Sequence, residues 1–102
     1  MADQRQVGRQ EQFVRQREID RRWEQARAAA ERSARAEVER IEALLVRMDR
    51  TKQSTSVRNL ATRLGTARHG LRQSLTLGTW RAHLRATGPE RYAALKAELE
   101  SD

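Results

Sequence analysis

The fold of this 102-residue chain is decided by residues 11–49, which read EQFVRQREIDRRWEQARAAAERSARAEVERIEALLVRMD. The stretch contains neither proline nor glycine and is rich in Ala, Glu, Arg and Gln, which are strong helix formers. Oppositely charged side chains recur three or four residues apart, as in Glu18/Arg22 and Glu37/Arg40, and such pairs stabilise a helix. The sequence therefore predicts one long helix, roughly 60 Å in length at ~1.5 Å per residue.

An apolar stripe follows one face of this helix. Its members recur at a mean spacing of about 3.6 residues, the period of a helix face: Trp23, Ala26, Ala30, Ala34, Val38, Ile41, Leu45 and Met48. A single helix cannot bury such a stripe. We therefore expect pairing with a second copy, in a coiled-coil-like homodimer, or with a partner helix, and the residues expected at that oligomerisation seam are Trp23, Val38, Ile41, Leu45 and Met48. A solvated single helix held by its ion pairs is the alternative.

The rest of the chain predicts a flexible arm before the long helix and a small helical domain after it. Residues 1–10 are polar with no periodic apolar face, which favours the arm. After the long helix (11–50), the hydroxyl-rich run 51–56 forms a linker into a basic helical domain, 51–102. The expected fold class is all-α, and Ile41, Leu44, Leu45 and Met48 are expected to pack under residues 57–75.

Short amphipathic pieces punctuated by glycine and hydroxyl residues make up that domain. The first, carrying Leu60 and Leu64, is expected to end at Gly65, and a second carries Leu71 and Leu75. Thr79 is placed to cap a third helix, in which Trp80 is expected to be a core residue. Gly88-Pro89 ends that helix and starts a last one, whose apolar face consists of Tyr92, Leu95 and Leu99.

The net charge of +7 is concentrated in one segment of the chain. Residues 51–89 contain seven Lys or Arg and no Asp or Glu, whereas residues 1–50 mix 12 Arg with 10 acids. A block of one sign costs self-repulsion, so it usually faces a polyanionic partner. This distribution favours a nucleic-acid partner.

Several classes of protein and site are disfavoured by the composition. The chain has no Cys, so neither disulfides nor thiolate metal sites are expected, and the two histidines lack clustered carboxylates. No apolar run is long enough for a membrane span and no signal peptide is evident, so we expect a protein of the cytoplasm or of the inside of a phage particle. No nucleophile–base set or phosphate loop is present, which argues against an enzyme and against a cofactor.

Residues 57–76, VRNLATRLGTARHGLRQSLT, resemble the helix-turn-helix of bacterial, phage and plasmid DNA-binding proteins. Ala61 provides the small residue where the two helices cross, and Gly65 follows four residues later at the turn. Apolar residues fill the angle between the helices at the required spacings, namely Leu60, Leu64, Leu71 and Leu75. An ordinary helical hairpin could use the same residues.

The resemblance implies a set of DNA-contacting residues. In such motifs the second helix enters the major groove, and the outer face of that helix here carries Arg68, His69, Arg72, Gln73 and Thr76. Arg and Gln can read guanine and adenine by paired hydrogen bonds. Arg58, Arg63 and Lys52 are expected near phosphates.

Two functions follow from these observations. The first is a non-enzymatic, dimeric protein that reads duplex DNA at two half-sites, as a phage or plasmid regulator or accessory factor. The alternative is a helical structural or assembly subunit, such as part of a phage particle or ribonucleoprotein or an inhibitor. In that alternative residues 51–89 contact nucleic acid or an acidic protein without reading sequence.

Overall fold

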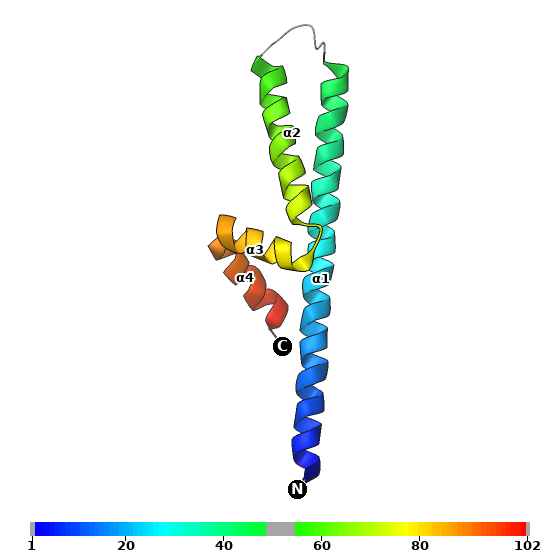
Figure 1. Ribbon diagram of the computed structural model, residues 1–102, viewed down its shortest axis with the longest axis vertical. Coiled ribbons are helices and arrows are strands. Elements are labelled where there is room, and N and C mark those ends of the chain that lie inside the picture. The colour runs from blue at the N-terminus through cyan, green and yellow to red at the C-terminus, as the bar shows by residue number, and fades with distance from the viewer. Residues whose placement is uncertain (1, 49–54, 102) are drawn as a thin grey trace.

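The computed structural model describes residues 2–48 and 55–101, with side chains from Glu11 onward. This part of the chain contains four helices and no strand, which confirms the all-α class. The helices are α1 (Ala2–Arg47), α2 (Thr55–Gln73), α3 (Leu77–Thr87) and α4 (Pro89–Glu100). The molecule is a rod, about 78 Å long and 22 by 18 Å across, because α1 spans most of its length (Figure 1).

The upper half of the rod is a helical hairpin in which α2 runs antiparallel beside α1 (Figure 1). Its core consists of Val38 and Ile41 from α1 and Leu64 from α2. Partly buried apolar side chains complete it, namely Leu45, Leu60, Ala67 and Leu71. The expected packing under residues 57–75 is thereby confirmed for Ile41 and Leu45, whereas Leu44 and Met48 do not belong to this core cluster.

Beside the middle of α1 lies a lobe in which α3 crosses away from α2 and α4 returns towards α1, and below it α1 continues alone (Figure 1). Trp23 of α1 packs there against Trp80 and Leu84 of α3. Trp80 is buried, as expected, and the predicted apolar face of the last helix packs onto the same cluster through Tyr92, Leu95 and Leu99. Gly88 closes α3 by donating its N–H to the Leu84 carbonyl, and Pro89 opens α4.

The apolar stripe of α1 is covered within the chain itself. Trp23 and Ile41 are each 1% exposed and Val38 is 8% exposed, because α2, α3 and α4 lie against them. Burial of Trp23, Val38 and Ile41 therefore does not require a second copy or a separate partner, and pairing of two chains stays a prediction. Only the end of the stripe near Ile41 was expected to pack against residues 57–75, and no later helix was expected to cover Trp23.

Gly65 does not end a helix, which corrects the expected two-helix arrangement of residues 57–76. The helix α2 continues from Thr55 to Gln73 through both Gly65 and Gly70, and no described glycine has a positive φ. An interior glycine costs about 1 kcal/mol relative to alanine. That cost is outweighed by burial of Leu60, Leu64 and Leu71, which reach α1 together only if the helical period is unbroken.

Two further expectations about helix ends are also corrected. Residues 2–10, expected as a flexible arm, belong to α1. The N-cap of α3 is Thr76, not Thr79: the Thr76 side chain accepts the Thr79 N–H at 3.3 Å. Because Thr76 has extended backbone angles, it ends the α2–α3 turn three residues earlier than the sequence suggested.

Replacing Gly65 by Ala is expected to raise the free energy of unfolding by about 0.5–1 kcal/mol. A Cβ at this position meets no atom within 4 Å, so the gain in helix propensity comes without a clash. Urea unfolding followed by far-UV circular dichroism measures the change. The reverse exchange at exposed Ala61, also within α2, is the matched control and should lower stability by a similar amount. A destabilised Gly65→Ala protein would instead indicate a left-handed turn at residue 65.

Candidate nucleic-acid interface

Most of the DNA-contacting residues expected from the sequence lie on α2. These are Arg58, Arg63, Arg68, His69, Arg72 and Gln73. Thr76 lies in the turn that follows, and Lys52 lies outside the described residues. Because α2 is one helix, these side chains point outward on several sides of it and do not share one recognition face.

Two of the arginines are paired with acidic residues of α1. Arg63 lies 3.7 Å from the Glu37 carboxylate, and Arg68 donates a hydrogen bond to Glu42 at 3.1 Å. Since Arg63 and Arg68 are five residues apart, they lie on opposite sides of the buried face of α2. They therefore join the two arms of the hairpin from either side, as exposed surface ion pairs.

The charge of Arg63 is compensated by a carboxylate that stays ionised. Arg40, one turn along α1, donates two hydrogen bonds to Glu37 and lowers the pKa of that carboxyl, and the nearby Arg63 lowers it further. Glu37 thus remains negative at neutral pH beside Arg63. This reduces the positive charge that Arg63 can offer to a phosphate.

Arg58 and Arg72 have a different environment. Both side chains are exposed, and within the described part of the chain neither forms an ion pair. They are 14 residues apart, so they lie on nearly the same face of α2, roughly 21 Å from each other along its axis. Ala61 and Gly65 lie between Arg58 and Arg72 on that face. Because their side chains are small, a large ligand can approach the backbone of α2 closely there.

His69 and Thr76 have structural partners. The His69 ring packs edge-on against His83 of α3, with centroids 5.7 Å apart, and so joins α2 to α3. The Thr76 hydroxyl donates to the Thr79 hydroxyl at 2.7 Å, in addition to its role as the N-cap of α3. Gln73 is half-buried as the last residue of α2. Base reading by His69 and Thr76 would disrupt these contacts.

Arginines of α1 hold the carboxyl ends of two helices, a role that the sequence reading did not assign. Arg27 donates to the Ser74 carbonyl at 2.7 Å, just past α2, while paired with Glu24 and Glu31. Arg22 donates to the carbonyl of Ser101, just past α4, at 2.8 Å. A cation at a helix carboxyl end is favoured by the helix dipole. These two arginines therefore fix the positions of α2 and α4 along α1.

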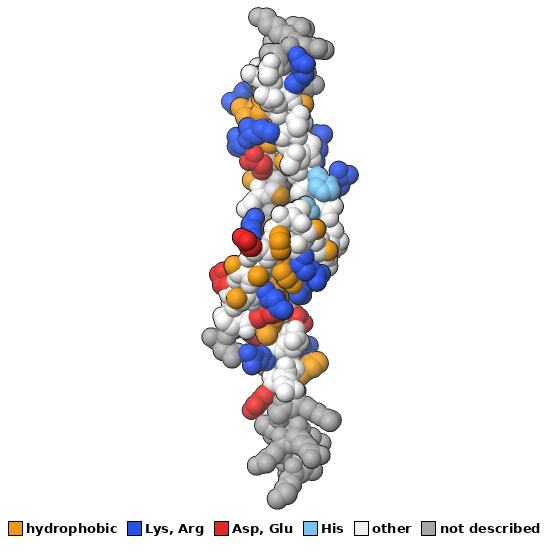
Figure 2. Space-filling model, turned by 90° about the vertical axis from the view of Figure 1, so that its left-hand side faces the viewer, with side chains coloured by type: hydrophobic (Ala, Val, Ile, Leu, Met, Phe, Trp, Pro, Cys, Tyr) orange, Lys and Arg blue, Asp and Glu red, His pale blue; other side chains and the backbone are white. Residues whose placement is uncertain are grey.

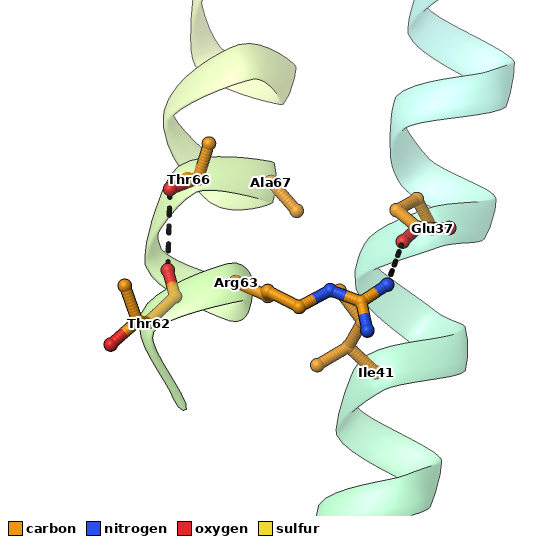
Figure 3. Close-up of a pocket in the computed structure, with 6 residues that line it drawn as sticks. All are labelled: Glu37, Ile41, Thr62, Arg63, Thr66 and Ala67. Atoms are coloured by element: carbon orange, nitrogen blue, oxygen red, sulfur yellow. Dashed lines mark hydrogen bonds and ion pairs between the residues drawn. The ribbon is translucent and has the colours of Figure 1, made fainter. Parts of the chain in front are cut away.

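A cavity of about 320 Å³ lies between α1 and α2 on the Arg63 side of the hairpin (Figure 3). Ile41 and Ala67 form its apolar part, and Glu37, Arg63, Thr62 and Thr66 surround it. The Thr66 hydroxyl donates to the Thr62 carbonyl within α2. The cavity holds no catalytic arrangement of nucleophile and base, and its one acid and one arginine compensate each other.

Basic side chains recur along the face that α2, α3 and α4 present, from the upper end of the rod to the lobe (Figure 2). Arg81 and Arg85 of α3 were not among the residues expected to bind nucleic acid, although they belong to the acid-free segment. Their spacing of four residues indicates a shared helix face. Their position beside Tyr92 of α4 depends on the packing of two short helices, which no local pattern predicts.

Among the described helices, none combines the length and the apolar character required to cross a bilayer. Comparison with known protein families, with curated proteins and with solved structures gives no match to this chain. The candidate interface therefore rests on its own geometry and charge.

Proposed function

We propose that this protein is a non-enzymatic nucleic-acid-binding protein that contacts the phosphate backbone of duplex DNA without reading its base sequence. The contact surface is the outward face of α2, and its principal cations are Arg58 and Arg72. Such contacts supply affinity and orientation, while sequence information would require base-edge contacts in a groove.

One observation carries this proposal: the segment that forms α2 and α3 contains six arginines and no acid, and four of those arginines, two of them on α2, have no ion pair among the described residues. In α1 the charges are mixed, with nine Arg and eight acids over residues 11–47. Acids of α1 compensate Arg63 and Arg68 but not Arg58 or Arg72. A polyanion lying along α2 would compensate the remaining charge.

The course of α2 favours backbone contact over base reading. A helix-turn-helix presents the first turns of its second helix to the major groove. In this chain residues 66–73 continue the same helix as residues 55–65, so no helix begins there. Arg68 is also paired with Glu42, and His69 is packed against His83. We therefore propose the form of DNA binding that needs neither a recognition helix nor paired half-sites.

Replacing Arg58 or Arg72 by Gln is expected to weaken duplex binding severalfold on every sequence tested. Each released phosphate contact reduces the slope of log affinity against log salt by about 0.9. The double variant should therefore lose close to two units of slope. Fluorescence anisotropy with a labelled duplex of mixed sequence, repeated over a range of salt concentrations, measures both quantities.

Arg32→Gln is the matched control for these variants. Arg32 is exposed on α1, with no ion pair among the described residues, and lies nine residues from Ile41, so it faces away from α2. The same loss of one charge at Arg32 should leave the salt slope nearly unchanged. Equal losses of slope in the Arg32, Arg58 and Arg72 variants would mean that net charge alone drives binding, and the proposed face would be wrong.

A second candidate function is that of a subunit in a larger assembly, and exposed apolar residues on α1 favour it. Phe13 and Val14 are each 64% exposed, on the length of α1 that extends below the lobe (Figure 1). A partner protein, or a second copy of the chain, would cover them. Truncation of both to Ala should then weaken the association measured by sedimentation without changing the stability of the chain.

A further inference from the structure

The lobe formed by α3 and α4 gathers cations around the single tyrosine of the chain. Arg81 donates a hydrogen bond from Nη2 to the Tyr92 hydroxyl oxygen at 3.1 Å. The guanidinium of Arg85, one turn further along α3, lies 5.5 Å from the centroid of the Tyr92 ring. Lys96 follows Tyr92 by one turn on α4. Three positive side chains thus surround one phenol.

Arg81 is fixed in this arrangement by aromatic contacts. Its guanidinium lies 4.4 Å from the centroid of the buried Trp23 ring, an attractive cation–π geometry. Within the described chain no carboxylate pairs with Arg81, and its Nε is buried without a hydrogen-bond partner. The positive charge of Arg81 is therefore held beside Tyr92 without being neutralised.

The Tyr92 hydroxyl has an unused donor. Its oxygen accepts from Arg81, and among the described residues no group accepts its proton. The hydrogen bond from Arg81, and then the charges of Arg81, Arg85 and Lys96, lower the pKa of Tyr92 despite some opposition from burial. A more acidic phenol is a stronger hydrogen-bond donor to an anion.

We propose that the Tyr92 hydroxyl, Arg85 and Lys96 together bind a phosphate group, which receives a hydrogen bond from Tyr92 and charge from the two cations. Among the described residues the acid that pairs with these cations is Glu100: its Oε2 lies 3.9 Å from Lys96 Nζ, and its Oε1 accepts from the Trp23 indole N–H at 3.4 Å. A phosphate would therefore compete with Glu100 for Lys96, whereas Arg85 has no ion pair among the described residues. The assignment of this phosphate to nucleic acid rests on the function proposed above. Free inorganic phosphate could occupy the site through the same hydrogen bond and charges.

The first test uses inorganic phosphate and the absorbance of the phenolate. Because the chain has one tyrosine, a pH titration in the ultraviolet reports Tyr92 alone. A bound anion that accepts the phenol proton stabilises the neutral form, so phosphate should raise the pKa of Tyr92 relative to chloride at the same ionic strength. Arg85→Gln should abolish the difference, and Arg32→Gln should preserve it. Identical titrations in phosphate and chloride would overturn the site.

The second test asks whether a DNA phosphate uses the site. Tyr92→Phe keeps the ring that packs against Trp23 and removes only the hydroxyl. We expect it to weaken duplex binding about three- to tenfold with an unchanged salt slope, since no charge is lost. Arg85→Gln should instead reduce the slope by about 0.9. Tryptophan emission confirms that the lobe remains folded, because both tryptophans lie in its core.

Failure of this site and failure of the proposed function give different results. If phosphate does not shift the titration of Tyr92, and duplex binding depends on Arg58 and Arg72 but is unchanged in both the Tyr92→Phe and Arg85→Gln variants, the site on the lobe is wrong and the proposed function stands. If phosphate raises the pKa of Tyr92 while no duplex binds, the site stands for free phosphate and the proposed function is wrong.

Discussion

Trp23→Ala is expected to lower the free energy of unfolding by about 3–5 kcal/mol, the range for removal of a fully buried aromatic side chain. Trp23 is 1% exposed and links three helices. Its ring lies edge-on to Trp80 at 6.1 Å between centroids and beside Tyr92 at 5.8 Å. Truncation to Ala leaves a cavity where α3 and α4 meet α1, so the lobe should separate from α1 first.

Two measurements follow this change. Urea unfolding gives the loss of stability, and the emission of the remaining Trp80 should shift to the red as the lobe opens. Phe13→Ala is the matched control, because Phe13 is an aromatic residue of the same helix that is 64% exposed, and it should change stability by no more than ~0.5 kcal/mol. Equal effects of the two truncations would contradict the assignment of Trp23 to the core.

Ile41→Ala is expected to cost about 2–5 kcal/mol and to act on the hairpin instead of the lobe. Ile41 is 1% exposed and packs with Val38 and with Leu64 of α2. Its loss should release α2 from α1, and backbone amides of α2 should then exchange their hydrogens faster. Hydrogen exchange followed by mass spectrometry measures this for each helix.

Val46→Ala is the control for the hairpin core. Val46 is also β-branched and also on α1, but it is 74% exposed, so its truncation should alter neither stability nor exchange in α2. If Ile41→Ala were as mild as Val46→Ala, the hairpin core would not depend on the apolar stripe of α1, and the packing described here would be wrong.

The helices themselves could be predicted from the sequence because their signals are local. The absence of Pro and Gly over residues 11–49 and the ion pairs along that stretch specify α1. Gly88-Pro89 marks the boundary of α3 and α4 as the structure has it. The 3.6-residue stripe also gave the buried face of α1 correctly, through Trp23, Val38 and Ile41.

The cover of the Trp23 end of that stripe could not be predicted, because the sequence pattern identifies a buried face and not which helix packs on it. As far as the sequence pattern shows, a second copy and the later helices of the same chain could bury the apolar stripe of α1 equally well. The same ambiguity affected Gly65, which can end a helix or lie inside one. The packing of Leu60, Leu64 and Leu71 against α1 favours a continuous α2, and this packing is not evident from the local sequence around Gly65.

The positive charge of the candidate site could be predicted from the sequence, but the ion pairs formed by its arginines could not. The acid-free segment is evident from composition, and Arg58 and Arg72 were among the residues expected to bind nucleic acid. Two of the arginines are compensated by acids of α1, in the pairs Arg63–Glu37 and Arg68–Glu42. The residues of each pair are 26 positions apart in the sequence, so no local pattern predicts the contact. The cations around Tyr92 likewise depend on how α3 meets α4.

The most direct test of sequence-independent backbone binding is selection from a random pool of short duplexes at several salt concentrations, followed by sequencing of the retained fraction. The account predicts retention without an enriched motif, and an affinity that falls steeply as salt rises. An enriched motif of two spaced half-sites would contradict it and restore the dimeric reader of DNA sequence. Absence of retention at low salt would contradict nucleic-acid binding altogether and favour a protein partner for α2 and α3.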